Sequence, residues 1–167
     1  ATIIGLLSLI QDVTNADLRI DQFLVRDHLL IGNEFPGRMS AMIAAGLVLG
    51  SLVLVWCAHY RGAQARLFAE AVVGSILASA GLSTLLGYGA GLPAVYTWGT
   101  ATATSPMAAI ALGLFGSALL LIAWRESMQA EGDAPSWSPM PAVIGCVTLT
   151  VVLWIGLYAR EQAFIST

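Results

Sequence analysis

Four long apolar stretches alternate with polar segments along this chain, and charged or polar residues bound each of them. A bilayer core about 30 Å thick is crossed by about 20 apolar residues in a helix. Lipid offers no hydrogen-bond partners, so each stretch has to satisfy its own backbone and is predicted to be helical. The pattern therefore predicts an all-α, polytopic transmembrane helical bundle. Its full spans are Met39–Ala58, Leu67–Gly89, Ser105–Trp124 and Met140–Tyr158.

The N-terminal part of the chain is harder to assign. Ala1–Ile10 is apolar but too short to cross a bilayer, so it is predicted to be a partial span. The following segment, 11–37, is polar, and Asp17–Leu24 within it has apolar residues at helical spacing. We expect a short amphipathic helix on the membrane surface there. It either covers the end of the bundle or docks a ligand or partner.

The other connections differ in character. Tyr60–Arg66 is short and basic, whereas Gly91–Thr104 is uncharged. Glu126–Pro139 is acidic and contains two prolines, which predicts a loop.

An internal duplication is predicted from two short alignments. Gly5–Ile10 aligns with Gly81–Leu86, and Ser40–Ala44 aligns with Ser105–Ala109. The alternative is chance similarity between apolar helices. With the duplication, Ala1–Ile10 corresponds to the second half of a span. The chain is then one transmembrane domain over 1–167, with repeat 1 at about 1–59, repeat 2 at about 67–125 and a final span at about 140–158.

Composition agrees with a membrane protein. Hydrophobic residues make up 57% of the 167 residues and charged residues only 10%, against about 25% charged in soluble domains. The net charge is −3, which argues against a nucleic-acid partner because such partners require a basic surface. The expected partners are the lipid bilayer and other transmembrane helices, either of a second copy or of subunits in a larger complex.

Aromatic and basic residues mark the two membrane surfaces. Trp and Tyr favour the interfaces, and Arg favours cytoplasmic loops. One surface is predicted to hold Arg61 and Arg66, and we place it in the cytoplasm, so that the C-terminus lies on the other side. The expected interface anchors are Trp56, Trp124 and Trp137 on the first side, and Trp98 and Trp154 on the second.

Two pairs of small residues lie four positions apart within spans. They are Gly46 with Gly50 and Gly113 with Ser117. Such pairs let helix backbones approach closely in lipid. They predict helix–helix packing sites, either inside the bundle or between subunits.

Few residues of this chain are of the types that catalyse reactions or bind cofactors and metals. Cys57 and Cys146 lie in apolar runs and are predicted to be small core residues. Glu70 falls near the start of its span, where an interfacial position is favoured over a buried proton carrier. His28 and His59 belong to opposite membrane sides, so they cannot share a metal or a haem. We therefore expect no cofactor, no metal site and no enzymatic activity.

The segment Pro36-Gly37-Arg38-Met39-Ser40 and its second copy Thr104-Ser105-Pro106-Met107 form a degenerate repeated motif. It resembles the membrane-embedded N-terminal regions of bacterial sensor histidine kinases and diguanylate cyclases. The likeness covers most of the chain, although Ile43 stands where the first copy of that pattern usually has Thr. The resemblance implies a sensory and anchoring region in the bacterial inner membrane, with any signalling output outside these residues. The alternative is an accessory structural subunit of a photosynthetic or respiratory complex.

Overall fold

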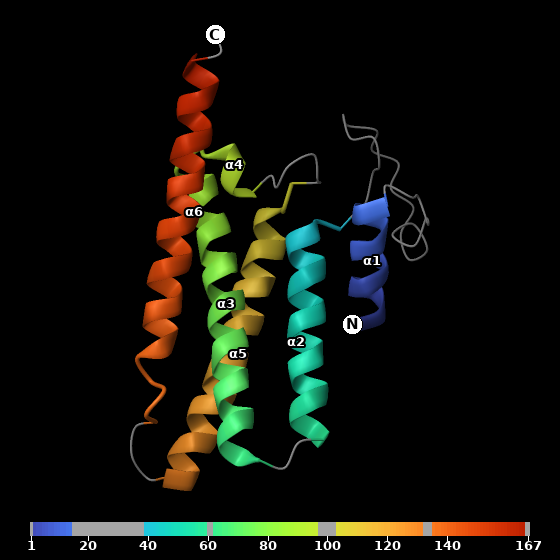
Figure 1. Ribbon diagram of the computed structural model, residues 1–167, viewed down its shortest axis with the longest axis vertical. Helices are drawn as coiled ribbons and strands as arrows, with labels where there is room; N and C mark the ends of the chain where they lie inside the picture. Colours follow the sequence, from blue (N-terminus) through green and yellow to red (C-terminus); the bar gives the residue numbers. More distant parts are fainter. Residues whose placement is uncertain (1, 15–38, 60–61, 97–102, 132–134, 166–167) are drawn as a thin grey trace.

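The computed structural model describes residues 2–14, 39–59, 62–96, 103–131 and 135–165. These residues form helices, with no strand among them. The helices are α1 (Thr2–Thr14), α2 (Ala41–His59), α3 (Ala63–Gly89), α4 (Pro93–Tyr96), α5 (Pro106–Glu131) and α6 (Met140–Ile165). The predicted all-α bundle is confirmed (Figure 1).

Four of the helices are long and apolar enough to cross a membrane: Ala41–His59, Gln64–Gly89, Pro106–Ala130 and Met140–Tyr158. Even the shortest, of 19 residues, is about 28 Å long at 1.5 Å per residue, which matches a bilayer core. These four helices overlap the four predicted spans. The chain is therefore a multi-pass membrane protein.

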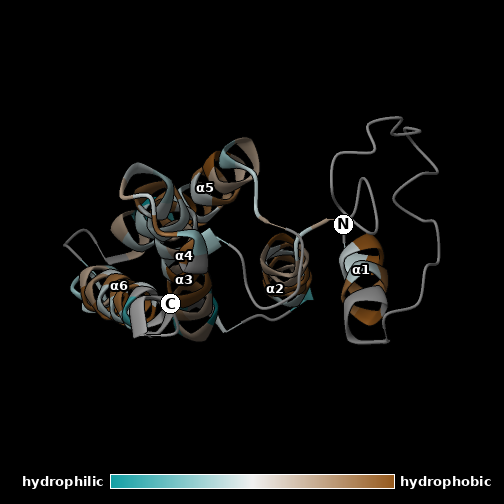
Figure 2. Cartoon of the chain, turned by 90° about the horizontal axis from the view of Figure 1, so that it is seen from above, coloured by the Kyte–Doolittle hydropathy of each residue, from teal (hydrophilic) through white to brown (hydrophobic). Residues whose placement is uncertain are grey.

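Helix α3 is the centre of the bundle. It packs most extensively on α5 and also contacts α2, α4 and α6. Helix α1 packs on α2 at one edge, and α6 packs on α3 at the other (Figures 1 and 2). The four long helices alternate in direction, so the ends of α2 and α5 share one end of the bundle with the starts of α3 and α6.

Local sequence explains where α3 and α5 end and begin. Gly91 has φ +64, and the Leu92 N–H donates to the Gly87 carbonyl at 2.9 Å, which closes the C-terminus of α3. Glycine is favoured in this left-handed position because it has no Cβ. At the start of α5, the Ser105 hydroxyl accepts from the Ala108 N–H at 3.2 Å, with Pro106 as first helical residue.

The structure corrects several predicted boundaries. Helix α5 continues to Glu131, so 126–131 is helix and not the predicted loop. Helix α6 continues past Tyr158 to Ile165, and α1 continues past Ile10 to Thr14. A helix leaving the bilayer keeps its internal hydrogen bonds in water, so charges that end the apolar run do not end the helix. The amphipathic helix expected at 17–24 lies outside the described residues.

The two aligned segments make equivalent contacts. A Cβ placed on Gly5 would lie 2.9 Å from the Ala44 carbonyl oxygen, and one on Gly81 would lie 2.6 Å from that of Ala109. Gly5 aligns with Gly81 and Ala44 with Ala109, so the α1–α2 and α3–α5 hairpins close at corresponding positions. The duplication stays a prediction, which this equivalence supports.

Candidate functional site

The closest approach of two helix backbones among the described residues joins α3 to α5 through glycine. A Cβ on Gly116 would lie 2.3 Å from the Ala78 backbone nitrogen, and one on Gly74 would lie 2.8 Å from the Gly116 carbonyl oxygen. Such distances leave room for hydrogen only, so these glycines allow the two backbones to touch. The four-residue spacing rule does not identify Gly74, Gly81 or Gly116 as packing residues. Gly74 and Gly81 are seven residues apart, and Gly116 follows Gly113 by three, so none of them has another glycine four positions away.

The predicted packing residues differ in what they contact. Gly46 and Gly50 on α2 face Leu112 and Phe115 of α5, so this pair packs inside the bundle. Gly113 faces Gly81, with 3.9 Å between a Cβ placed on it and the Gly81 Cα. Ser117 is exposed, so it does not pack inside the bundle, and packing between subunits stays a prediction for this residue. The buried row of α5 passes through position 116, so position 117 lies beside it. That row is Ala109, Leu112, Gly116, Leu119, Ala123 and Ser127.

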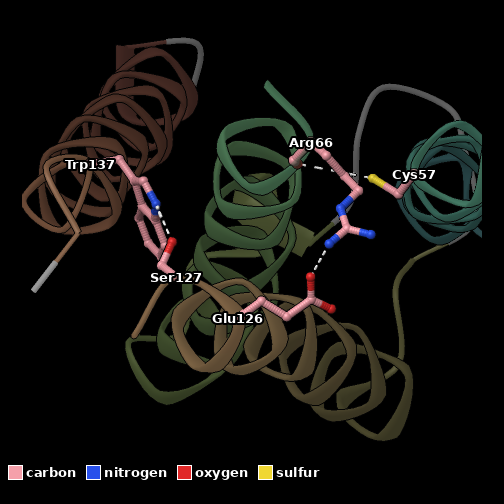
Figure 3. A network of polar contacts seen from close by, with 5 residues as sticks. All are labelled: Cys57, Arg66, Glu126, Ser127 and Trp137. Atoms are coloured by element: carbon pink, nitrogen blue, oxygen red, sulfur yellow. Dashed lines mark hydrogen bonds and ion pairs between the residues drawn. The ribbon is translucent and has the colours of Figure 1, made fainter. Parts of the chain in front are cut away.

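Polar side chains gather where α2 ends and α3 begins (Figure 3). Arg66 on α3 forms an ion pair and hydrogen bond with Glu126 on α5. On its other side, the Cys57 thiol of α2 points at the Arg66 carbonyl, at 4.0 Å. Three helices therefore meet at one arginine, and we call Cys57, Arg66, Glu70 and Glu126 the polar cluster.

Glu70 is the most deeply buried member of the polar cluster. Its side chain is 4% exposed, and its Oε2 has no hydrogen-bond partner. The Nε of Arg66 is likewise buried without a partner. Glu70 lies one helical turn after Arg66, near the start of α3, and its side chain is buried inside the bundle. Burial inside the protein does not set the depth in a bilayer, so the interfacial position stays a prediction.

A second polar contact lies on the α6 side of the same end. The Trp137 Nε1–H donates to the Ser127 hydroxyl at 3.2 Å, as Figure 3 shows. The ring of Trp137 also meets that of Trp124 edge-on, with centroids 6.1 Å apart. Trp137 and Ser127 border a pocket of about 710 Å³ that Trp56 and Phe68 also line. The lining of this pocket is mostly apolar, with Gln64, Ser127 and Ser136 among its residues.

The opposite end of the bundle is held by hydroxyls and rings. The Tyr88 hydroxyl donates to the Thr104 carbonyl at 2.7 Å, and the Thr104 hydroxyl donates to that of Ser40 at 2.9 Å. Tyr88 also stacks on Tyr96 of α4, with ring centroids 3.9 Å apart. Since Ser40 precedes α2 and Thr104 precedes α5, these contacts tie together the starts of the two aligned helices.

The tryptophans predicted to be interface anchors are largely exposed where they are described, and their interfacial role stays a prediction. Trp56 and Trp124 are 41% and 42% exposed at the end shared with Trp137, and Trp154 of α6 is 68% exposed. Trp98 lies outside the described residues. Of the two cysteines predicted to be core residues, Cys57 is buried, but Cys146 is exposed on α6. That expectation is wrong because α6 packs on the bundle along one side only.

The described residues contain no group of three His, Cys, Asp or Glu side chains placed to hold a metal ion. His59 uses its Nδ1 to hydrogen-bond the Val55 carbonyl of its own helix, at 2.9 Å. No match was found when the chain was compared with protein-family models, with curated proteins and with solved structures. Function therefore has to be argued from the geometry.

Proposed function

We propose that this chain is the non-catalytic, membrane-embedded input and anchoring region of a bacterial signalling protein in the inner membrane. The observation that supports this proposal is that α6 is attached to the bundle along one side only. Helix α6 is 26 residues long, and only 6% of its apolar window is buried. Among the described residues it makes backbone contacts with α3 and α4 alone. A long helix held at the edge of a rigid core is suited to move as one body.

The contact surface of α6 favours such movement. Gly145 faces the Ser79 hydroxyl of α3, and Gly156 faces Val95 and Leu92 near α4. The hydroxyls of Ser75, Ser79 and Ser83 all donate to carbonyls of their own helix, at 2.5–2.7 Å. Between α6 and α3, the described side chains form no hydrogen bond with each other. Because this contact surface consists of small residues and hydroxyls that are already hydrogen-bonded, α6 can slide or rotate slightly against α3 at a small cost in free energy.

The α3–α5 contact supplies the fixed reference for this movement. The close glycine contacts and the Arg66–Glu126 pair hold those two helices together at several levels. A stimulus that prefers one position of α6 over another would shift the population between them. The stimulus would be a ligand or a change in the bilayer, and the output would be carried by a domain joined to α6.

A distance measurement tests the mechanism. Spin labels at native Cys146 on α6 and at Ala118→Cys on α5 report the separation of these helices in bilayers of two thicknesses. Both positions are exposed, whereas Cys57 is buried. We expect the distance distribution to change with thickness. The control pair, Ile76→Cys with Ala118→Cys in a Cys146→Ser background, spans α3 and α5 and should stay unchanged. An unchanged α5–α6 distance contradicts the proposal.

One observation favours an accessory structural subunit instead. Trp154 and Tyr158 stack on the outer face of α6, with centroids 6.0 Å apart, and are 68% and 55% exposed. Large aromatic rings are frequent at helix interfaces with other chains. Gentle-detergent purification with intact mass spectrometry separates the two functions. A mass that includes a kinase or cyclase region supports the sensor. Fixed stoichiometry with pigment-binding or electron-transfer subunits supports the accessory subunit.

A further inference from the structure

A groove runs between α5 and α6 at the middle of the bundle. The two helices both pack on α3, but within the described residues they make no close backbone contact with each other. The space between them is about 360 Å³. Ala78 and Leu82 of α3 form its floor, Gly113 and Ser117 of α5 form one wall, and Gly145 of α6 forms the other. All these residues belong to helices that are long and apolar enough to cross a membrane.

The groove offers no charge and no free hydrogen-bonding side chain. Its two hydroxyls are already used, because Ser79 donates to the Ser75 carbonyl at 2.6 Å and Ser117 to the Gly113 carbonyl at 2.8 Å. No Asp, Glu, Lys or Arg lines it. A neutral hydrocarbon chain complements such a surface, whereas a polar ligand would lose its hydrogen bonds there.

The lining glycines are not required for helix packing. A Cβ on Gly113 would meet only the Gly81 Cα, at 3.9 Å, and one on Gly145 would meet only the Ser79 Oγ, at 3.5 Å. Both are ordinary van der Waals distances. At Gly116 the same addition would lie 2.3 Å from the Ala78 nitrogen. Gly113 and Gly145 therefore keep the groove wide, whereas Gly116 keeps the helices close.

We propose that this groove binds one acyl chain of a membrane phospholipid, which fills the space between α5 and α6. An empty space of this size would deprive its lining atoms of dispersion contacts, and a flexible acyl chain restores them. The bound chain acts as a spacer that sets the distance of α6 from α5. This site stands on the groove itself and does not depend on a signalling role.

Photolabelling tests the site. The purified full chain in dodecyl maltoside is titrated with a phosphatidylcholine that carries a diazirine in the middle of one acyl chain. Adducts are then mapped by mass spectrometry. We expect labelling of 110–117 and 145–149 to saturate at low lipid fractions and to be displaced by unlabelled phosphatidylcholine. Labelling at the outward-facing Leu121 and Val151, which are 69% and 48% exposed, should rise in proportion to lipid.

Filling the groove provides the second measurement. Gly113→Leu and Gly145→Leu place a side chain where the acyl chain lies, and each should reduce groove labelling to the level of the outer faces. Ala118→Leu places the same leucine side chain at an exposed position outside the groove and should leave labelling unchanged. Helicity by circular dichroism checks that each variant folds.

Two results overturn the proposal. The first is groove labelling that rises linearly with lipid, as at the outer faces. The second is labelling displaced by an isoprenoid quinone but not by phosphatidylcholine, which assigns the groove to another class of ligand. Saturation and competition are measured on the unaltered chain, so they decide the question even if a leucine variant does not fold.

Discussion

The Arg66 guanidinium on α3 is paired with the Glu126 carboxylate on α5, and this pair spans the contact between the two most closely packed helices. The side chains are 32% and 38% exposed, so solvent and headgroups reach them. A partly exposed pair of this kind fixes geometry more than it adds stability.

A double-mutant cycle measures the strength of this pair. Arg66→Met, Glu126→Gln and the double variant are unfolded with SDS in mixed micelles. We expect a coupling energy of about 1 kcal/mol or less, because exposure screens the attraction. A coupling of several kcal/mol would mean that the pair is shielded from solvent in the membrane.

Replacing Glu70 should not weaken the protein. Its buried Oε2 lacks a partner, and burying an incompletely satisfied carboxylate costs free energy. We expect Glu70→Met to be neutral or stabilising in the same unfolding assay, with exposed Glu161→Gln as the control. Destabilisation by about 3 kcal/mol or more would show that Glu70 is a fully engaged partner of Arg66.

Gly116 and Gly113 provide a matched pair on α5. Gly116→Ala should destabilise by about 1–3 kcal/mol, because its Cβ meets the α3 backbone and neither helix can yield locally. Gly113→Ala should be neutral or slightly stabilising, since alanine favours helix and the added methyl has room. The reverse order of stabilities would contradict the helix contact described here.

Trp137→Phe removes the donor to the buried Ser127 hydroxyl while keeping most of the ring. We expect a loss of about 1 kcal/mol, the usual contribution of one hydrogen bond. Trp154→Phe is the control, because the Trp154 ring lies on the outer face of α6. Equal stability of the two variants would argue against the hydrogen bond.

The two thiols should differ in reactivity. Cys146 is exposed and Cys57 is buried, so a membrane-permeant maleimide should modify Cys146 in the folded protein. Cys57 should react only after denaturation. Mass spectrometry of peptides from native and denatured samples measures the modification of each cysteine. Modification of Cys57 in the native state would show that α2 separates from α3.

The sequence predicts the spans well, because the features that define a span can be read along the chain without knowing how the helices pack. Charges and Trp residues mark membrane surfaces, and apolar length marks crossing. Helix ends were less predictable. Helices α5 and α6 end at Glu131 and Ile165, past the charged residues that end the apolar runs, where hydropathy no longer separates helix from loop.

Packing between helices could be predicted only in part. Gly46 and Gly50 share one face by their spacing, whereas the Gly74–Gly116 contact depends on how two separate helices are aligned. The burial of Glu70 likewise depends on α2 and α5 covering one face of α3. The relative alignment of two helices and the covering of one helix face by others cannot be predicted from the residue pattern of a single helix.

The edge position of α6 also bears on the order of assembly. Because α6 contacts α3 and α4 alone among the described residues, the α3–α5 hairpin can reach its final structure before α6 joins it. By the same reasoning, α6 can detach while the α3–α5 contact stays intact. In hydrogen exchange, its amides should therefore open at a lower free energy than those of α3.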